Sequence, residues 1–277
     1  MSTQPPSAAR YTEGDAFQAE KRTLFSREWL PVCHAQQVAT PGDFMSNSVG
    51  GWPVFAVRGT DGVVRAFRNV CRHQQMQVVE KPSGHCDQLR CRYHGWTYDL
   101  AGRFVTAPEP VAPPDVCAPG NNLQPLPTHE ASGFVLFTLD GTEAPSTQAL
   151  DALLHGEDCV GSVTAEINCN WKTYLEEHLT NAAVWQSPLL VARRHADGVI
   201  VEQIVPRTFL RTRVIFHAFG NARASLQARA DAAKRAAEAL QAERAAGTMP
   251  VPEGIVGRLH AHLDAALAND AGPQHGD

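Results

Sequence analysis

Two short clusters of cysteine and histidine stand out in the first half of the chain. Cys71 and His73 form a C-x-H pair, and after seventeen intervening residues Cys91 and His94 form a C-x-x-H pair. Two thiolates and two neutral imidazoles can hold a [2Fe–2S] cluster, with the thiolates on one iron and the imidazoles on the other. We therefore expect these four side chains to be metal ligands, each pair at the tip of a β-hairpin.

A structural zinc site is an alternative for four such ligands. In zinc fingers both cysteines come first and both histidines second, whereas each pair here holds one of each. A further alternative is that the four residues are unrelated buried side chains. The run His94-Gly95-Trp96-Thr97-Tyr98 extends the second pair and favours the iron–sulfur centre.

These residues resemble the Rieske domain of the ring-hydroxylating (Rieske non-haem iron) oxygenase α subunits. The resemblance includes Gly102, a stretch between Tyr11 and Phe44, and Asn170-Trp171-Lys172 with Glu176, so it covers about residues 10–185. It implies an α+β chain, in which an all-β Rieske [2Fe–2S] domain joins a truncated, helix-grip-like catalytic-type domain. It also implies an oxidoreductase that works with O₂, as a monooxygenase or a dioxygenase.

We expect three regions along the chain. Residues 1–40 form a helical segment that packs on the second domain, residues 41–145 form the Rieske domain with a Pro-rich connection, and residues 146–277 form the truncated catalytic-type domain with C-terminal helices. Periodicity predicts helices over 14–29, 146–155, 170–185, 222–246 and 255–267. Dense β-branched runs predict strands over 54–57, 63–67, 134–137, 199–205 and 208–216. The seven prolines between Ala107 and Pro127 exclude a helix or a central strand there.

Composition narrows the class of protein. The net charge of −5 over 277 residues gives no basic excess for nucleic acid or a membrane surface. No apolar run approaches the length of about twenty residues that a membrane span needs, and the polar N-terminus is unlike a signal peptide. The seven cysteines form no disulfide framework. A reducing, cytoplasmic location is expected.

The second metal site of the resembled family is missing from this sequence. In that family two histidines and one carboxylate hold a mononuclear Fe(II). An ungapped match from Asn170 places the acidic bridging position on Thr180 and the two histidine positions on Ala183 and Pro188. Neither Ala183 nor Pro188 has a lone pair to offer iron, and the family's third ligand would fall beyond residue 277. We expect mononuclear iron only in a partner subunit.

Two surface features have alternative interpretations. Four arginines surround the ligand pairs and are either a docking patch for an acidic redox partner or solvated loop charge: Arg72, Arg90, Arg92 and Arg103. Small apolar residues at helical spacing predict a packing seam, either on its own domain or between subunits: Leu226, Ala230, Ala233, Ala237 and Leu240.

The sequence therefore predicts a Rieske electron-transfer subunit of a hetero-oligomeric, trimer-based oxygenase. Its expected partners are a ferredoxin or flavin reductase and a full-length α subunit. The alternatives are a free-standing Rieske electron carrier and a self-sufficient oxygenase with a non-standard iron site.

Overall fold

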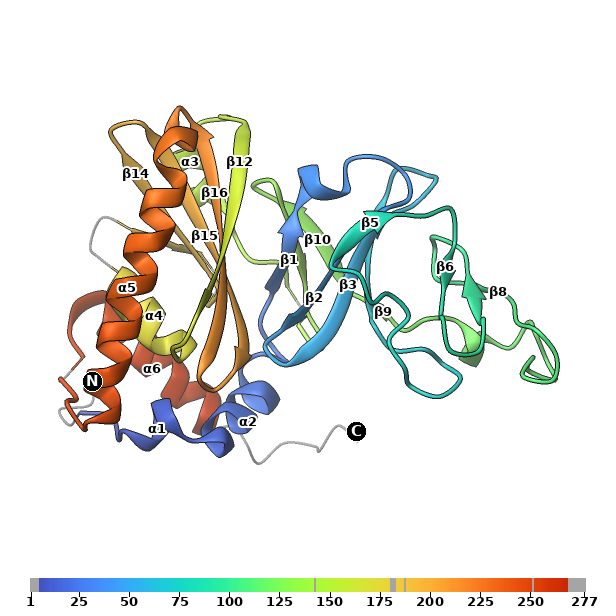
Figure 1. The fold of residues 1–277 in the computed structure, drawn as a ribbon, viewed down its shortest axis with the longest axis horizontal. Coiled ribbons are helices and arrows are strands. Elements are labelled where there is room, and N and C mark those ends of the chain that lie inside the picture. The colour runs from blue at the N-terminus through green and yellow to red at the C-terminus, as the bar shows by residue number, and fades with distance from the viewer. Residues whose placement is uncertain (1–4, 142, 180–182, 187, 251, 269–277) are drawn as a thin grey trace. The chain divides into compact units, whose positions relative to one another are not determined.

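The computed structural model describes residues 5–141, 143–179, 183–186, 188–250 and 252–268. The chain divides into two compact units, drawn as ribbons in Figure 1. Unit 1 comprises Met1–Glu28 and Pro145–Asp277, and unit 2 comprises Trp29–Ala144. The first division falls after Glu28 instead of near residue 40, because the strand Leu30–His34 pairs with Phe134–Phe137 inside unit 2.

Unit 2 consists of antiparallel strands in three sheets, as an all-β domain should. The strands are β1 Leu30–His34, β2 Asp43–Val49, β3 Trp52–Arg58, β4 Val64–Arg68, β5 Ser83–His85, β6 Leu89–Arg90, β7 Thr97–Tyr98, β8 Phe104–Thr106, β9 Pro125–Leu126, β10 Thr128–Ala131 and β11 Phe134–Phe137. The sheet orders are β5-β2-β3-β4-β9, β1-β11-β10 and β6-β7-β8. The two predicted ligand pairs lie in this unit, one shortly after β4 in the loop to β5 and the other between β6 and β7.

The core of unit 2 joins its five-stranded sheet to the small sheet β6-β7-β8. Phe55 and Phe67 lie on adjacent strands with ring centroids 5.4 Å apart, and Tyr98 of β7 is buried in the same cluster. Gly102 approaches this cluster closely: its φ is +79°, and a Cβ there would lie 2.4 Å from the Phe67 ring. Only glycine fits, since other residues carry a Cβ and rarely adopt positive φ.

The segment between Ala107 and Pro127 is an irregular connection, as its prolines predict. It contains the 3₁₀ turn Pro119–Asn121 and reaches the main sheet only as the edge strand β9. An edge position is where a strand tolerates proline, because the missing N–H is not needed by a second neighbour.

Unit 1 combines an antiparallel sheet of order β12-β16-β15-β14-β13 with helices from both ends of the chain. The strands are β12 Cys159–Ile167, β13 Val184–Gln186, β14 Leu190–His195, β15 Gly198–Thr208 and β16 Arg211–Gly220. The helices are α1 Ala9–Thr12, α2 Gly14–Thr23, α3 Gln148–Leu154, α4 Trp171–His178, α5 Leu226–Ala245 and α6 Gly254–Ala268. With unit 2, this gives the α+β class. Within the described ranges, none of the helices has the length and apolar character needed to traverse a bilayer.

Helix α5 lies along the sheet of unit 1 and contacts β12 and β16, as Figure 1 shows. Four of the five predicted seam residues are buried within the unit, and Leu240 is half-buried: Leu226, Ala230, Ala233 and Ala237 are the buried ones. The seam therefore docks on its own domain, which is one of the two alternatives left by the spacing. The inter-subunit alternative is wrong for these residues, because side chains covered by their own unit are not available to a second chain.

Two helices are shorter than their patterns predict. The helix predicted over 14–29 ends at Thr23, where the N–H of Phe25 turns back to the carbonyl of Glu20 at 2.9 Å. The helix predicted over 170–185 ends at His178, and Leu179 is already extended with ψ of 90°. The chain then continues as β13. Apolar residues recur beyond both helix ends because turns and strands of unit 1 also bury side chains.

Candidate metal centre

The two predicted ligand pairs lie in two turns of the same kind. In each turn the cysteine N–H donates to the carbonyl five residues later, and the cysteine carbonyl accepts from the N–H four residues later. The distances are Cys71 N to Met76 O 2.7 Å, Gln75 N to Cys71 O 3.0 Å, Cys91 N to Trp96 O 2.8 Å and Gly95 N to Cys91 O 3.0 Å. Gln75 and Gly95 occupy matching positions with φ of 59° and 70°. The two turns are therefore structural counterparts.

These turns bring the two predicted histidine ligands together. Nδ1 of His73 lies 3.2 Å from Nδ1 of His94, and the ring centroids are 4.6 Å apart with the planes at 88°. Both imidazoles are partly exposed. Two ring nitrogens that face each other at this distance can both give a lone pair to one metal ion.

The two predicted cysteine ligands are buried and free of disulfides. Cys71 and Cys91 are each 2% exposed. The Sγ of Cys71 is 3.3 Å from the hydroxyl oxygen of Tyr98, and the Sγ of Cys91 is 4.0 Å from the carbonyl oxygen of Gln77. No set of three or more His, Cys, Asp and Glu side chains suited to a single metal ion occurs in the described ranges. A [2Fe–2S] cluster needs no such set, because each of its irons takes two protein ligands. The donors fit that cluster.

Three of the four predicted docking arginines, Arg72, Arg90 and Arg92, directly flank the ligand residues of these turns, and Arg103 lies in the turn between β7 and β8. All four side chains are exposed: Arg72, Arg90, Arg92 and Arg103. Arg92 is partly neutralised by Glu80, with Nε 2.6 Å from Oε1, and its guanidinium carbon lies 5.5 Å from the centroid of the Tyr93 ring. An open depression beside His94 is lined by Arg90, Arg92, Tyr93, Gly95, Pro108, Glu109 and Val111. The basic surface and the imidazole edge therefore adjoin each other.

Of the three positions matched to the resembled family's mononuclear-iron site, the two that the structure describes do not lie on a helix. Thr180 lies outside the described residues. Ala183 stands immediately before β13, and Pro188 is buried in the turn between β13 and β14, because α4 ends at His178. His178 itself donates from Nδ1 to the carbonyl of Tyr174 at 2.8 Å, and its ring stacks on that of Tyr174.

Glu176 of the same helix is the centre of a buried polar cluster that periodicity did not reveal. Its Oε1 accepts from the Tyr11 hydroxyl at 2.5 Å and from His260 Nε2 at 2.8 Å, and its Oε2 accepts from Arg244 Nη2 at 2.9 Å. The His260 side chain is only 7% exposed. His260 therefore faces the carboxylate of a helix far away in sequence and not the solvent.

The cluster keeps Glu176 ionised. Burial by itself raises the pKa of this carboxyl group, but the hydrogen bonds from His260 and Tyr11 and the charge of Arg244 outweigh it, so that the pKa lies below its usual value. Burial and the adjacent carboxylate raise the pKa of Tyr11 far above its ordinary value. Tyr11 is thus a permanent donor to Glu176.

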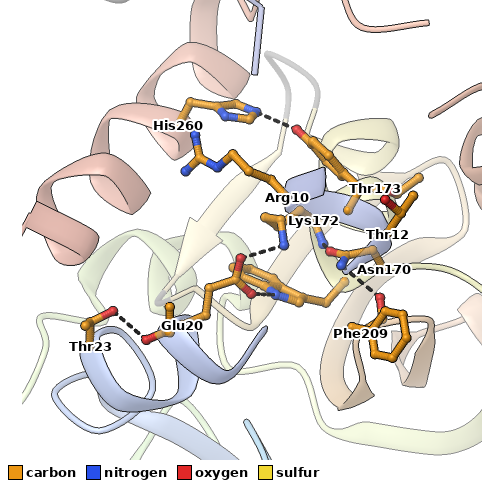
Figure 2. Close-up of polar contacts among 12 residues, drawn as sticks. Arg10, Thr12, Glu20, Thr23, Asn170, Lys172, Thr173, Phe209 and His260 are labelled. Carbon is orange, nitrogen blue, oxygen red and sulfur yellow. Dashed lines mark hydrogen bonds and ion pairs between the residues drawn. The ribbon is translucent and has the colours of Figure 1, made fainter. Parts of the chain in front are cut away.

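The Asn-Trp-Lys motif has a structural role of its own. Nζ of Lys172 lies 2.6 Å from Oε1 of Glu20, and Figure 2 shows the two side chains pointing toward each other. The indole N–H of Trp171 donates to the second oxygen of Glu20 at 2.7 Å. Asn170 caps α4 by accepting from the N–H of Lys172 at 3.0 Å, and its amide donates to the carbonyl of Phe209 at 2.8 Å. The motif therefore fastens α4 to α2 and to the turn after β15.

Comparison with known proteins agrees with the donor set. A family model described as the Rieske [2Fe-2S] domain matches residues 28–128. The chlorobenzene dioxygenase subunit alpha of Cupriavidus sp. (strain PS12) is 31% identical over 206 residues, which are 69% of this chain and 44% of that protein. The carnitine monooxygenase oxygenase subunit of Escherichia coli (strain K12) is 27% identical over 179 residues, which are 61% of this chain and 48% of that protein. The chain spans about half the length of these curated relatives.

Solved structures share the fold. A quaternary ammonium Rieske monooxygenase, described in terms of carnitine oxidation by gut microbiota and inter-subunit electron transfer, superposes with a TM-score of 0.74. The match covers 95% of this chain and 94% of that chain at 17% sequence identity. At this identity the likeness is one of fold.

Proposed function

Because the chain carries a Rieske [2Fe–2S] domain and is homologous to the α subunits of Rieske oxygenases, we propose that it is an electron-transfer subunit of a hetero-oligomeric Rieske oxygenase. It takes electrons from a ferredoxin or flavin reductase and passes them to the mononuclear iron of a full-length partner α subunit. The partner uses them for an O₂-dependent hydroxylation or demethylation. The chain acts in the cytoplasm and is not catalytically competent alone.

The observation that carries the proposal is the 3.2 Å approach of the His73 and His94 ring nitrogens, in the same two turns that bury Cys71 and Cys91. We assign Cys71 and Cys91 to one iron and His73 and His94 to the other. When bound, the cluster supplies one-electron transfer. The protein buries the thiolates of Cys71 and Cys91 and leaves the imidazoles of His73 and His94 partly exposed. A redox partner can therefore approach the cluster from the imidazole side.

The surface around that edge suits an acidic electron donor. Arg72 and Arg90 are exposed beside the ligand residues, and Arg103 is exposed in the turn between β7 and β8, whereas Arg92 is already engaged by Glu80. Charges of one sign around a site steer an oppositely charged partner and raise the rate of encounter. We propose that ferredoxin or reductase docking uses this patch.

The need for a partner follows from unit 1. Ala183 and Pro188 stand where the resembled family has its two histidines, and neither side chain can bind a metal. Thr180 stands at the acidic bridging position. Electron transfer between subunits, with which the quaternary ammonium monooxygenase is described, would let a complete cluster in this chain serve an iron held elsewhere.

Two other functions remain to be tested against this one. A free-standing carrier requires only unit 2 and leaves the buried polar contacts of unit 1 without a functional counterpart. A self-sufficient oxygenase with a non-standard iron site requires a third iron in this chain. Iron and sulfide analysis distinguishes the self-sufficient oxygenase from the other two functions. The electron-transfer subunit and the free-standing carrier each need two irons per chain, whereas the self-sufficient oxygenase needs three.

The deciding experiment is single-turnover reoxidation. The chain is reduced, mixed with a full-length α subunit, substrate and O₂, and the oxidation of its cluster is followed by absorbance. Rapid oxidation is expected only with the complete mixture, together with product formation. The matched control is a partner whose bridging Asp is changed to Ala: both metal centres stay loaded, and oxidation of this chain's cluster slows strongly.

Substrate-dependent O₂ uptake with product from the isolated chain would refute the proposal and support the self-sufficient oxygenase. Reoxidation that is indifferent to the partner's Asp change would support the free carrier. Restoring histidines by Ala183→His and Pro188→His is not expected to give activity to the isolated chain, since these positions lie beyond the end of α4.

A further inference from the structure

Trp96 connects a predicted iron ligand of one turn to the other turn. It is 4% exposed and directly precedes β7, and thus belongs to the second turn. Its ring stacks on that of His73 in the first turn, with centroids 5.2 Å apart and planes within 9°. The second turn therefore holds the imidazole of the first by a face-to-face contact.

His73 has little else to fix the plane of its ring. Within the described ranges, its Nε2 makes no hydrogen bond, and its Nδ1 faces only His94. A histidine that binds a metal usually donates its second ring N–H to a protein acceptor, which sets the ring orientation. For His73 the parallel face of Trp96 provides that constraint. Among the described residues, no ring stacks in parallel on His94, and the Tyr93 ring lies 6.5 Å away at a tilt of 44°.

The indole nitrogen of Trp96 fastens a different part of the unit. Its Nε1–H donates to the carbonyl of Val111 at 2.9 Å, in the Pro-rich connection. The connection passes so close to the second turn that a Cβ on Gly95 would lie 3.1 Å from Cδ of Pro108. Phe104 of β8 packs on Trp96 with centroids 4.7 Å apart. One side chain thus contacts both a ligand and the segment that lines the depression beside His94.

We propose that Trp96 is a positioning residue with two separable roles: its ring face sets the plane of the His73 imidazole at the iron, and its N–H anchors residues 107–111 across Gly95. Both roles concern the cluster-bearing unit itself. They hold whichever partner receives the electrons, so their failure and that of the proposed function are distinguishable.

Two substitutions separate the roles. Trp96→Phe keeps an aromatic face for His73 and removes the N–H. Trp96→Met keeps an apolar side chain that can fill the space and removes both the planar face and the N–H. The readouts, on the cluster-loaded full chain, are the ¹⁴N couplings of the histidine ligands in pulsed EPR of the reduced cluster, its reduction potential, and hydrogen exchange of the Val111 N–H.

In Trp96→Phe we expect unchanged ¹⁴N couplings and potential. The Val111 N–H donates to the carbonyl of Pro108 at 3.0 Å, and its exchange should be faster by about fivefold, because the segment that holds this bond opens more readily without the hydrogen bond from Trp96. In Trp96→Met we expect the same faster exchange together with a broadened set of couplings for one histidine and a shifted potential. Trp52→Met, on β3 of the same unit, is the matched control and should alter none of the three readouts.

Altered couplings in Trp96→Phe would overturn the first role, and unaltered exchange in that variant would overturn the second. Unaltered couplings and potential in Trp96→Met would also overturn the first role. If Trp96→Met does not retain its cluster, Trp96→Phe still tests both roles, because altered couplings would overturn the first and unaltered exchange would overturn the second.

Discussion

Lys172 and Glu20 form an ion pair that is closed to water: Nζ and Oε1 are 2.6 Å apart, and the side chains are 0% and 2% exposed. Burial lowers the pKa of Lys172, and the neighbouring Glu20 opposes that shift. The indole N–H of Trp171 donates to the second carboxylate oxygen. A buried charge is tolerated only when it is paired and hydrogen-bonded, so each member of this contact depends on the others.

Changing Glu20→Gln should destabilise unit 1 by about 3–5 kcal/mol, because it leaves the buried Lys172 without a counter-charge. The measurement is urea denaturation followed by tryptophan fluorescence, which reports the free energy of unfolding. The control is Glu166→Gln on β12, which removes the exposed carboxylate partner of Arg213 on β16. This change should lower the free energy of unfolding by less than about 1 kcal/mol. Equal losses in the two variants would show that the Lys172 pair contributes no more than a surface pair.

Glu176→Gln should lower stability at neutral pH by an amount that shrinks in acid. The folded-state pKa of Glu176 is depressed, so its ionised form contributes stability above the unfolded-state pKa of about 4.3, and that contribution is lost as the pH falls through the folded value. The measurement is the difference in free energy of unfolding between native chain and variant from pH 7 down to pH 3. A difference that stays constant over this range would contradict the prediction.

Gly102→Ala should disrupt unit 2 much more than Gly62→Ala does. The two glycines have almost the same φ, +79° and +78°. A Cβ at 102 would meet the Phe67 ring at 2.4 Å, whereas a Cβ at 62 would have no described atom within 4 Å. The positive φ costs each variant about 1–2 kcal/mol. Overpacking adds about 1–3 kcal/mol or more at 102 alone. Thermal unfolding of both variants, with cluster content as a second readout, measures the excess, and similar melting temperatures would argue against the close contact.

His94→Cys, where the cluster still assembles, should lower the reduction potential by on the order of 100 mV or more. Thiolate donates more charge to iron than neutral imidazole does, and clusters with four cysteines lie well below Rieske centres. Spectroelectrochemistry on the purified chain measures the change. An unchanged or raised potential would mean that His94 is not an iron ligand.

The cluster-bearing half of the fold was predictable because its chemistry is local in sequence. Cys71 and His73 are separated by one residue, and their counterparts by two, so spacing alone indicates the donor set. The glycine at 102 and the prolines near Ala107 mark turns and loops by their own backbone limits. What spacing does not predict is the stacking of Trp96 on His73, since the two residues lie in different turns and meet only through the fold of unit 2.

Unit 1 was less predictable because its decisive contacts are distant in sequence. Hydrophobic periodicity located α5 and α6 but extended α4 through residue 185, since the strand that follows His178 is apolar as well. The carboxylate of Glu176 meets Tyr11 and His260 from the two ends of the chain. Neither Tyr11 nor His260 belongs to a sequence motif. A histidine on a helix beside polar residues, such as His260, has the sequence pattern of a solvent-exposed residue.

The Glu176 cluster limits how the chain can be shortened or fused. Removing the N-terminus past Tyr11, or the C-terminus before His260, would strip a donor from a carboxylate that is 5% exposed and would leave α4 with a buried, poorly compensated charge. Proteolytic trimming should therefore stop outside residues 11 and 260 in the folded protein. Affinity tags and domain fusions belong beyond those two positions, where both chain ends can remain held by the same helix.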